Sequence, residues 1–290
     1  MLNADKEFEE LKTALKNFGV HKGDILYVAS DITQLTDNAS GKYDFKSFDE
    51  YQNFRAEFMN SLVNFFQDFV GTEGTLLLPV FTWTFCRGKK FSVKTTKGET
   101  GALNNWVLKN RSDFRRTQHP IYSFMVWGKD ADFLAGLENS DSWSEDSPFG
   151  YCHKNKAKML MLDVVPANCL TFVHYVEERI KVPWRYMKDF IGDYTDADGN
   201  TSRRKYSMFV RDLDIDSQLV TDTAVFDGKN VLHHAQWSEV DLYFMNFADA
   251  FNFYLDDLKN NDAKCCYIFK NYTPDWSCGQ THPDLKLSLD

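Results

Sequence analysis

The sequence predicts an α/β sandwich, and three observations favour this class. Helix-like and strand-like patterns alternate along the first third of the chain, which is typical of sheets covered by helices. The chain has 290 residues, enough to bury a large core. It is 43% hydrophobic and 16% aromatic, with 25 Phe, which argues against disorder and for a well-filled interior.

The first elements follow from apolar periodicity and turn residues. Phe8, Leu11, Leu15 and Phe18 share one helical face. The chain then turns through residues 21–24 before a continuous apolar run. The expected elements are a helix at 5–18, a buried strand at 25–29, a polar loop at 34–48, a helix at 54–70 and a strand at 75–80.

The remaining elements continue the alternation and then change character. Residues 190–230 are mixed polar, and Asp198-Gly199 is a hairpin turn signal. The expected elements are a helix starting at 101–108, strands at 122–127 and 159–162, a helix at 171–180 ending near Pro183, a helix at 244–258 and a strand at 264–269. We expect a single domain over 1–290 with a C-terminal elaboration from about residue 190.

Composition excludes several classes of function. The net charge is −9, from 33 Lys and Arg against 42 Asp and Glu, and the basic residues form no stripe that would bind nucleic acid. We find no apolar run long enough to span a bilayer, and residues 1–10 lack a secretory signal, so we expect a cytoplasmic protein. The common nucleotide-binding, hydrolase and zinc-protease motifs are absent.

Four zinc-type ligands crowd the C-terminal stretch: Cys265, Cys266, Cys278 and His282. Their spacing matches no standard zinc finger or ribbon, and adjacent cysteines in a strand point to opposite faces. We therefore expect no metal, although the sequence leaves a metal site there open.

One segment carries residues suited to proton transfer. Thr171, His174 and Glu177 are spaced three apart, so on a helix they lie along one side. The carboxylate can accept one imidazole N–H, which leaves the other ring nitrogen free to take a proton from an amine or thiol. Apolar flanking residues indicate a partly buried helix, but an ordinary surface pair has the same spacing.

The stretch from Thr171 to Glu177 resembles the T-x-x-H-x-x-E signature of the aminoglycoside 3-N-acetyltransferase family, also called antibiotic acetyltransferases. Further stretches resemble that family in the same order, over about residues 5–270. They lie at 21–30, at 74–82, at Thr96 with 101–103, at 115–123, at 147–150 and at 182–186.

The resemblance implies a three-layer α/β/α fold around a central mixed sheet, and acetyl transfer from acetyl-CoA to a sugar amine. It makes His174 the general base, oriented by Glu177, with Thr171 in the same site. It also implies partners for the CoA phosphates in two places, and no metal. These cofactor-binding candidates are Ser30 and Thr33 after the first strand, and Arg115, Arg116, Thr117 and Ser123 in the central block. A homodimer is a further possibility.

Two departures from the family pattern affect the predicted substrate. Asp31 stands where a small hydroxyl residue is usual, and residues 36–53 look like an insertion, so the entrance of the site is expected to be rebuilt. The stretch 81–88 resembles family members of surface-polysaccharide pathways, which favours a nucleotide-linked amino sugar as acceptor. An aminoglycoside acceptor is the alternative.

Another alternative is a non-catalytic relative that binds carbohydrate through exposed aromatic residues. Its candidates are Trp83, Trp143, Trp184 and Trp237.

Overall fold

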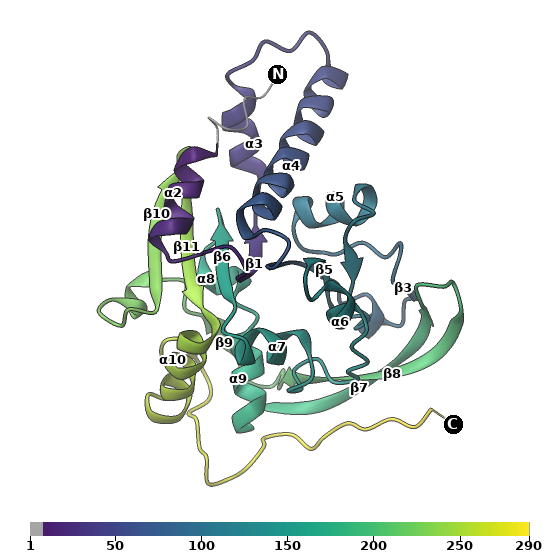
Figure 1. The fold of residues 1–290 in the computed structure, drawn as a ribbon. Helices are drawn as coiled ribbons and strands as arrows, with labels where there is room; N and C mark the ends of the chain where they lie inside the picture. Colours follow the sequence, from purple (N-terminus) through teal and green to yellow (C-terminus); the bar gives the residue numbers. More distant parts are fainter. Residues whose placement is uncertain (1–7, 290) are drawn as a thin grey trace.

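The computed structural model describes residues 8–289 as helices and strands in alternation (Figure 1). The helices are α2 (Glu9–Asn17), α3 (Thr33–Ser40), α4 (Phe48–Val70), α5 (Ala102–Asn110), α6 (Ala131–Ala135), α7 (Pro148–Lys154), α8 (Pro166–Cys169), α9 (Val173–Ile180) and α10 (Phe247–Asn260), with the 3-10 helices η1 (Phe85–Arg87) and η2 (Thr223–Phe226). The strands are β1 (Ile25–Ser30), β2 (Thr75–Phe81), β3 (Phe91–Ser92), β4 (Arg115–Arg116), β5 (Tyr122–Gly128), β6 (Lys158–Leu162), β7 (Arg185–Thr195), β8 (Thr201–Arg211), β9 (Ser217–Leu219), β10 (Leu232–Trp237), β11 (Val240–Asn246) and β12 (Tyr267–Phe269).

The central sheet is mixed, with seven strands in the order β10-β11-β6-β1-β2-β5-β4. Strand β1 pairs in parallel with β2 and β6, while antiparallel partners flank this parallel core on both sides. The carboxyl ends of β6, β1 and β2 therefore meet at one edge of the sheet, where open α/β sheets usually bind ligands.

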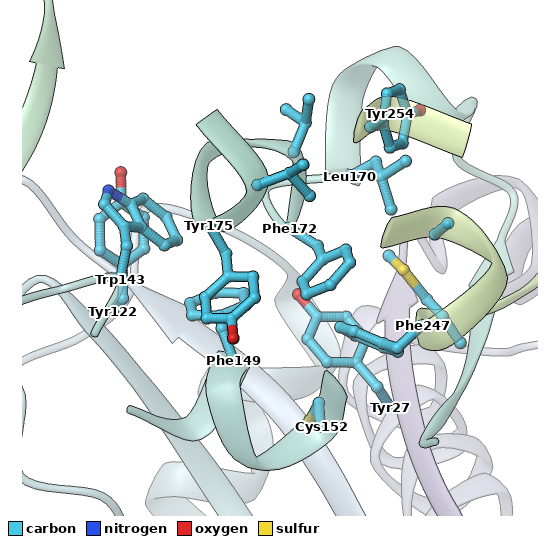
Figure 2. Close-up of a cluster of buried hydrophobic side chains, with 14 of the residues drawn as sticks. Tyr27, Tyr122, Trp143, Phe149, Cys152, Leu170, Phe172, Tyr175, Phe247 and Tyr254 are labelled. Atoms are coloured by element: carbon cyan, nitrogen blue, oxygen red, sulfur yellow. The ribbon is translucent and has the colours of Figure 1, made fainter. Parts of the chain in front are cut away.

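Alternating side chains of the sheet build two separate apolar layers. In β1, Leu26 and Val28 face the layer with α2, α3, α4 and α5, whereas Tyr27 and Ala29 face the layer with α7, α9 and α10. Figure 2 shows aromatic rings of the second layer, where Phe247 lies 4.6 Å from Phe172 between ring centroids. The expected three-layer α/β/α architecture with a mixed central sheet is thus observed.

The C-terminal third adds a second sheet in the order β3-β7-β8. Strands β7 and β8 form a long curved hairpin, closed by a turn in which Asp196 Oδ1 accepts the backbone N–H groups of Asp198 and Asn200 (Figure 1). The last residues run along β7, where Leu285 bridges to Lys188. The predicted hairpin signal at Asp198-Gly199 is confirmed.

Most predicted elements are present, with one clear error. Residues 34–48 were expected to be a polar loop, but α3 occupies Thr33–Ser40 and α4 already begins at Phe48. The helix forms because Leu35 and Ala39 are buried against the sheet and the Thr36 hydroxyl donates to the Ile32 carbonyl at 2.6 Å. Tertiary burial outweighs weak helix propensity here.

Two predicted helices have other bounds in the structure. The predicted helix at 5–18 is described from Glu9 to Asn17, and residues 5–7 lie outside the described residues. The helix expected at 244–258 starts only at Phe247, because the preceding residues complete β11. Between residues 8 and 289, no helix combines the length and the apolar character needed to cross a membrane.

Candidate active site

Two of the predicted proton-transfer residues, His174 and Glu177, lie on the short helix α9, whose apolar face packs on the sheet, whereas Thr171 lies in the turn before this helix, which begins at Val173 and not at 171 as predicted. Val173 and Val176 are buried in the core, and the helix ends where Lys181 adopts the left-handed conformation at φ 55°. His174 and Glu177 occupy another side of the helix, one turn apart. The packing of the apolar face therefore fixes the direction in which both side chains point.

His174 and Glu177 are in direct contact. Nδ1 of His174 lies 2.6 Å from Oε2 of Glu177, and the imidazole is 24% exposed whereas the carboxylate is fully buried. Oε1 of the same carboxylate accepts the Tyr267 hydroxyl at 2.8 Å and Nε1–H of Trp184 at 3.2 Å. Nε of Arg185 lies 2.7 Å from Oε2. The acid is thus held by four side chains from α9, β7, β12 and the turn before β7.

These contacts determine the charge of both groups. Burial alone would raise the pKa of Glu177, but the Arg185 cation and the His174 and Tyr267 contacts hold it at about 2. Burial lowers the pKa of His174, and Arg185 lowers it further against the opposing effect of Glu177. At neutral pH the pair is therefore a carboxylate beside a neutral imidazole, which is the state a general base requires.

A row of aromatic side chains connects this pair to the central sheet. Trp143 packs edge-on against His174, with ring centroids 5.5 Å apart. The ring centroids of Trp143 and Tyr122 are 4.2 Å apart, and both rings are seen in Figure 2. The Tyr122 hydroxyl accepts Nε1–H of Trp83 at 3.2 Å. The imidazole is thus backed by rigid apolar surface on one side.

A cavity of about 260 Å³ opens at the carboxyl ends of the parallel strands. Ser30 ends β1, Phe81 ends β2, and Val164 follows β6, so all three strands contribute. The cavity also reaches Thr171, in the turn three residues before His174, whereas His174 itself is not among its lining residues. Its remaining lining residues are Tyr27, Ala29, Pro79, Trp83, Thr100, Gly101, Asn104, Asn168 and Cys169.

Three polar atoms of this lining are buried and have no hydrogen-bond partner among residues 8–289: Ser30 Oγ, Thr100 Oγ1 and Asn104 Oδ1. The amide of Asn104 is fixed because its Nδ2 donates to the Pro79 carbonyl at 2.6 Å, so Oδ1 remains free. Buried polar groups are almost always satisfied, and unsatisfied ones require an explanation. Together they can hold a neutral polar ligand that both donates and accepts hydrogen bonds.

Two predicted cofactor residues, Ser30 and Thr33, lie together at the end of β1. Thr33 opens α3, and its backbone N–H donates to Asp31 Oδ1 at 2.9 Å. The acid that departs from the family pattern thus caps the helix with its carboxylate, which compensates part of its charge.

The central-block candidates lie away from this cavity, towards the β4 edge of the sheet. Arg115 is exposed and pairs with Asp132, whereas Arg116 is buried and donates to the Thr96 carbonyl at 2.6 Å and to Ser123 Oγ at 3.0 Å. Thr117 Oγ1 accepts the Phe124 N–H at 2.9 Å, and the Ser123 hydroxyl donates to Val80. The structure therefore brings Ser30 and Thr171 to one cavity but leaves this group apart from it.

The aromatic surface of the carbohydrate-binding alternative is not formed, which corrects that expectation. Trp143, Trp184 and Trp237 are buried in the core. Trp83 is partly buried and borders the cavity at the ends of the parallel strands.

The cysteine-rich stretch does not gather into a cluster. Cys266 is buried beneath β12, whereas Cys278 is exposed and His282 stacks on Tyr186. Within residues 8–289, no group of three or more His, Cys, Asp or Glu is arranged to hold a metal ion.

Sequence reasoning missed the residues that hold Glu177. Arg185 and Trp184 belong to the stretch 182–186, which matched the family but was given no role. Their position directly after the helix was an available signal. Tyr267 stands 90 residues beyond Glu177, and no sequence pattern connected the two.

The fold and the site define a class of protein: an α/β protein with an imidazole–carboxylate pair on α9 and a polar cavity at the carboxyl ends of its parallel strands. The model of the family described as aminoglycoside 3-N-acetyltransferase matches residues 44–259, which is 216 of 290 residues. The chain belongs to this family, and the resemblance stated above is confirmed. No curated protein sequence matches the chain.

Solved structures agree in fold. The aminoglycoside acetyltransferase described as AAC-IIIb in a binary complex with CoASH superposes with a TM-score of 0.67 at 17% identity, over 91% of this chain and 97% of that one. The YokD protein from Bacillus subtilis superposes with a TM-score of 0.65 at 17% identity, over 89% of this chain and 95% of that one. AAC-VIa bound to sisomicin superposes with a TM-score of 0.63 at 16% identity, over 87% of this chain and 97% of that one. By its family the chain is an acetyltransferase, and the AAC-IIIb structure was solved with CoASH bound.

Proposed function

We propose that the chain transfers the acetyl group of acetyl-CoA to an amino group of an aminoglycoside, with His174 as general base. The observation that supports this most is the contact between the neutral His174 imidazole and the buried Glu177 carboxylate. Thr171, three residues before His174, lines a cavity with three polar atoms that have no partner within residues 8–289. The family description favours an aminoglycoside over the nucleotide-linked amino sugar that residues 81–88 suggested.

The cavity suits the pantetheine arm of acetyl-CoA better than the acceptor. Its lining contains no carboxylate, which a polycationic acceptor would need, and its free hydroxyls and amide oxygen match the amide groups of a pantetheine. Thr171 has only a long 3.4 Å contact to the Cys169 carbonyl, so its hydroxyl is available to the thioester oxygen. Ser30 lines the cavity and Thr33 opens the following helix, which supports them as the proposed partners of the CoA phosphates.

The reaction then balances with His174 as proton carrier. The lone pair of the amine attacks the thioester carbon, the C–S bond breaks, and CoA leaves as a thiolate. The amine proton passes to Nε2 of His174 and from there to the thiolate sulfur. The products are the N-acetylated sugar and the free thiol of CoA.

Thiol release from acetyl-CoA tests the proposal across a panel of aminoglycosides and nucleotide-linked amino sugars. We expect release with aminoglycosides, and His174→Ala should lower turnover by about 10²–10⁴-fold while CoA still raises the melting temperature. The matched control is His234→Ala, because His234 is exposed on β10 and pairs with Asp241. Unchanged turnover in His174→Ala would refute the mechanism. Thiol release only with nucleotide-linked amino sugars would show that they, and not aminoglycosides, are the acceptors.

A further inference from the structure

Nδ1 of His174 faces two neighbours, one that requires a hydrogen-bond donor and one that requires an acceptor. Glu177 Oε2 lies at 2.6 Å and can only accept a hydrogen bond, whereas the Arg185 guanidinium lies at 2.9 Å and can only donate one. A neutral imidazole cannot satisfy both through the same nitrogen. The single ring proton therefore sits either on Nδ1, facing Glu177, or on Nε2, with Nδ1 accepting from Arg185.

The Arg185 side chain is held in place from several elements. One terminal nitrogen donates to the Phe209 carbonyl on β8 at 3.1 Å, and the other donates to the Tyr267 hydroxyl on β12 at 3.3 Å. The side chain is only 8% exposed, and Nε lies 2.7 Å from the Glu177 carboxylate. A guanidinium does not lose its proton in proteins, so a fixed positive charge stands beside the imidazole.

We propose that Arg185 is a positioning residue for acetyl transfer: it offsets the charge of Glu177 at Nδ1 and keeps the His174 ring neutral, so that the ring can take the amine proton. This inference rests on the proposed role of His174. It assigns a function to a residue that touches neither substrate.

The charges around His174 explain why Arg185 is needed. Two charged groups act on the pKa of His174: Arg185 from β7 lowers it, and Glu177 from α9 raises it. Burial raises the pKa of Tyr267 on β12 well above its usual value and that of Tyr122 on β5 to about 12, so both phenols are neutral. Trp143 contributes only its ring edge.

Without Arg185, the buried carboxylate would pull a second proton onto the ring. An imidazolium has no lone pair to accept the proton of the amine. A base that stays neutral below pH 7 therefore needs a cation near its acid, and the structure places one there.

The state of the ring can be measured without any substrate. In free wild-type enzyme with ¹⁵N-labelled histidine, we expect NMR to show that His174 titrates at lower pH than an ordinary histidine. In Arg185→Gln, His174 should titrate about one to three pH units higher. The matched control is Arg111→Gln, since Arg111 is also largely buried and pairs with Asp113, but contacts α4 instead of the active site.

The same shift should appear in turnover. The acid limb of the kcat/KM profile of Arg185→Gln should move to higher pH, which a purely structural role would not produce. Arg185→Lys keeps the charge, so its titration should stay near that of the wild type; it also serves if Arg185→Gln does not fold.

Two results would overturn the inference: a wild-type His174 that titrates no lower than an ordinary histidine, or equal titration of wild type and Arg185→Gln. Absence of thiol release with every acceptor would instead reject the proposed function, while the NMR titration would still decide the role of Arg185.

Discussion

The buried carboxylate of Glu177 gives the sharpest test of the site's energetics. Glu177→Gln keeps the shape of the side chain but removes the charge that compensates Arg185, whose guanidinium is 8% exposed. Breaking a buried ion pair by removing one partner costs about 3–5 kcal/mol. Since total stability is usually about 5–15 kcal/mol, we expect a large loss at pH 7.

The pKa of Glu177 gives the pH dependence of that loss. The folded protein holds this pKa at about 2 against an ordinary 4.5, so the unfolded chain binds the proton more readily. The carboxylate therefore stabilises the fold fully above pH 4.5, by about 3 kcal/mol. This contribution disappears as the pH falls from 4.5 to 2. The difference in unfolding free energy between wild type and Glu177→Gln should therefore narrow over that range.

Urea unfolding followed by tryptophan fluorescence at pH 7, 5, 4 and 3 measures the gap. Asp113→Asn is the matched control, because Arg111 also holds the pKa of Asp113 at about 2, but this carboxylate is 41% exposed. Solvent screening should limit its loss to under about 1 kcal/mol. Equal losses in the two variants, or a gap for Glu177→Gln that is constant with pH, would refute the reasoning.

Three further substitutions test the cavity and the aromatic row. Ser30→Ala removes a hydroxyl that has no partner, so the unfolding free energy should change by less than about 0.5 kcal/mol while the KM for acetyl-CoA rises; an unchanged KM would place the cofactor elsewhere. Trp143→Ala should cost about 3–5 kcal/mol in urea unfolding, because the ring is fully buried; a smaller loss would mean that the row repacks. Gly101→Ala should lose at least about 1 kcal/mol, since φ is +69° and the new Cβ would lie 2.6 Å from Asn104 Nδ2. It should also weaken the rise in melting temperature with CoA, and a normal rise would separate Asn104 from cofactor binding.

The amino-acid sequence by itself determined the local elements of this protein. A continuous apolar run predicted the buried strand at 25–29, and helical spacing placed His174 and Glu177 on one side of a helix. These features depend on backbone geometry within a few residues, which the order of side chains encodes directly. The ordered motifs then identified the family.

Only the tertiary structure decided which distant residues surround the catalytic pair. Arg185 and Tyr267 reach Glu177 from β7 and β12, because the packing of two sheets against α9 brings them together. The same packing turned Arg116 inward to backbone carbonyls and made a helix of the polar stretch after Ile32. Contacts of this kind depend on how whole elements stack, and periodicity along the chain carries no information about that.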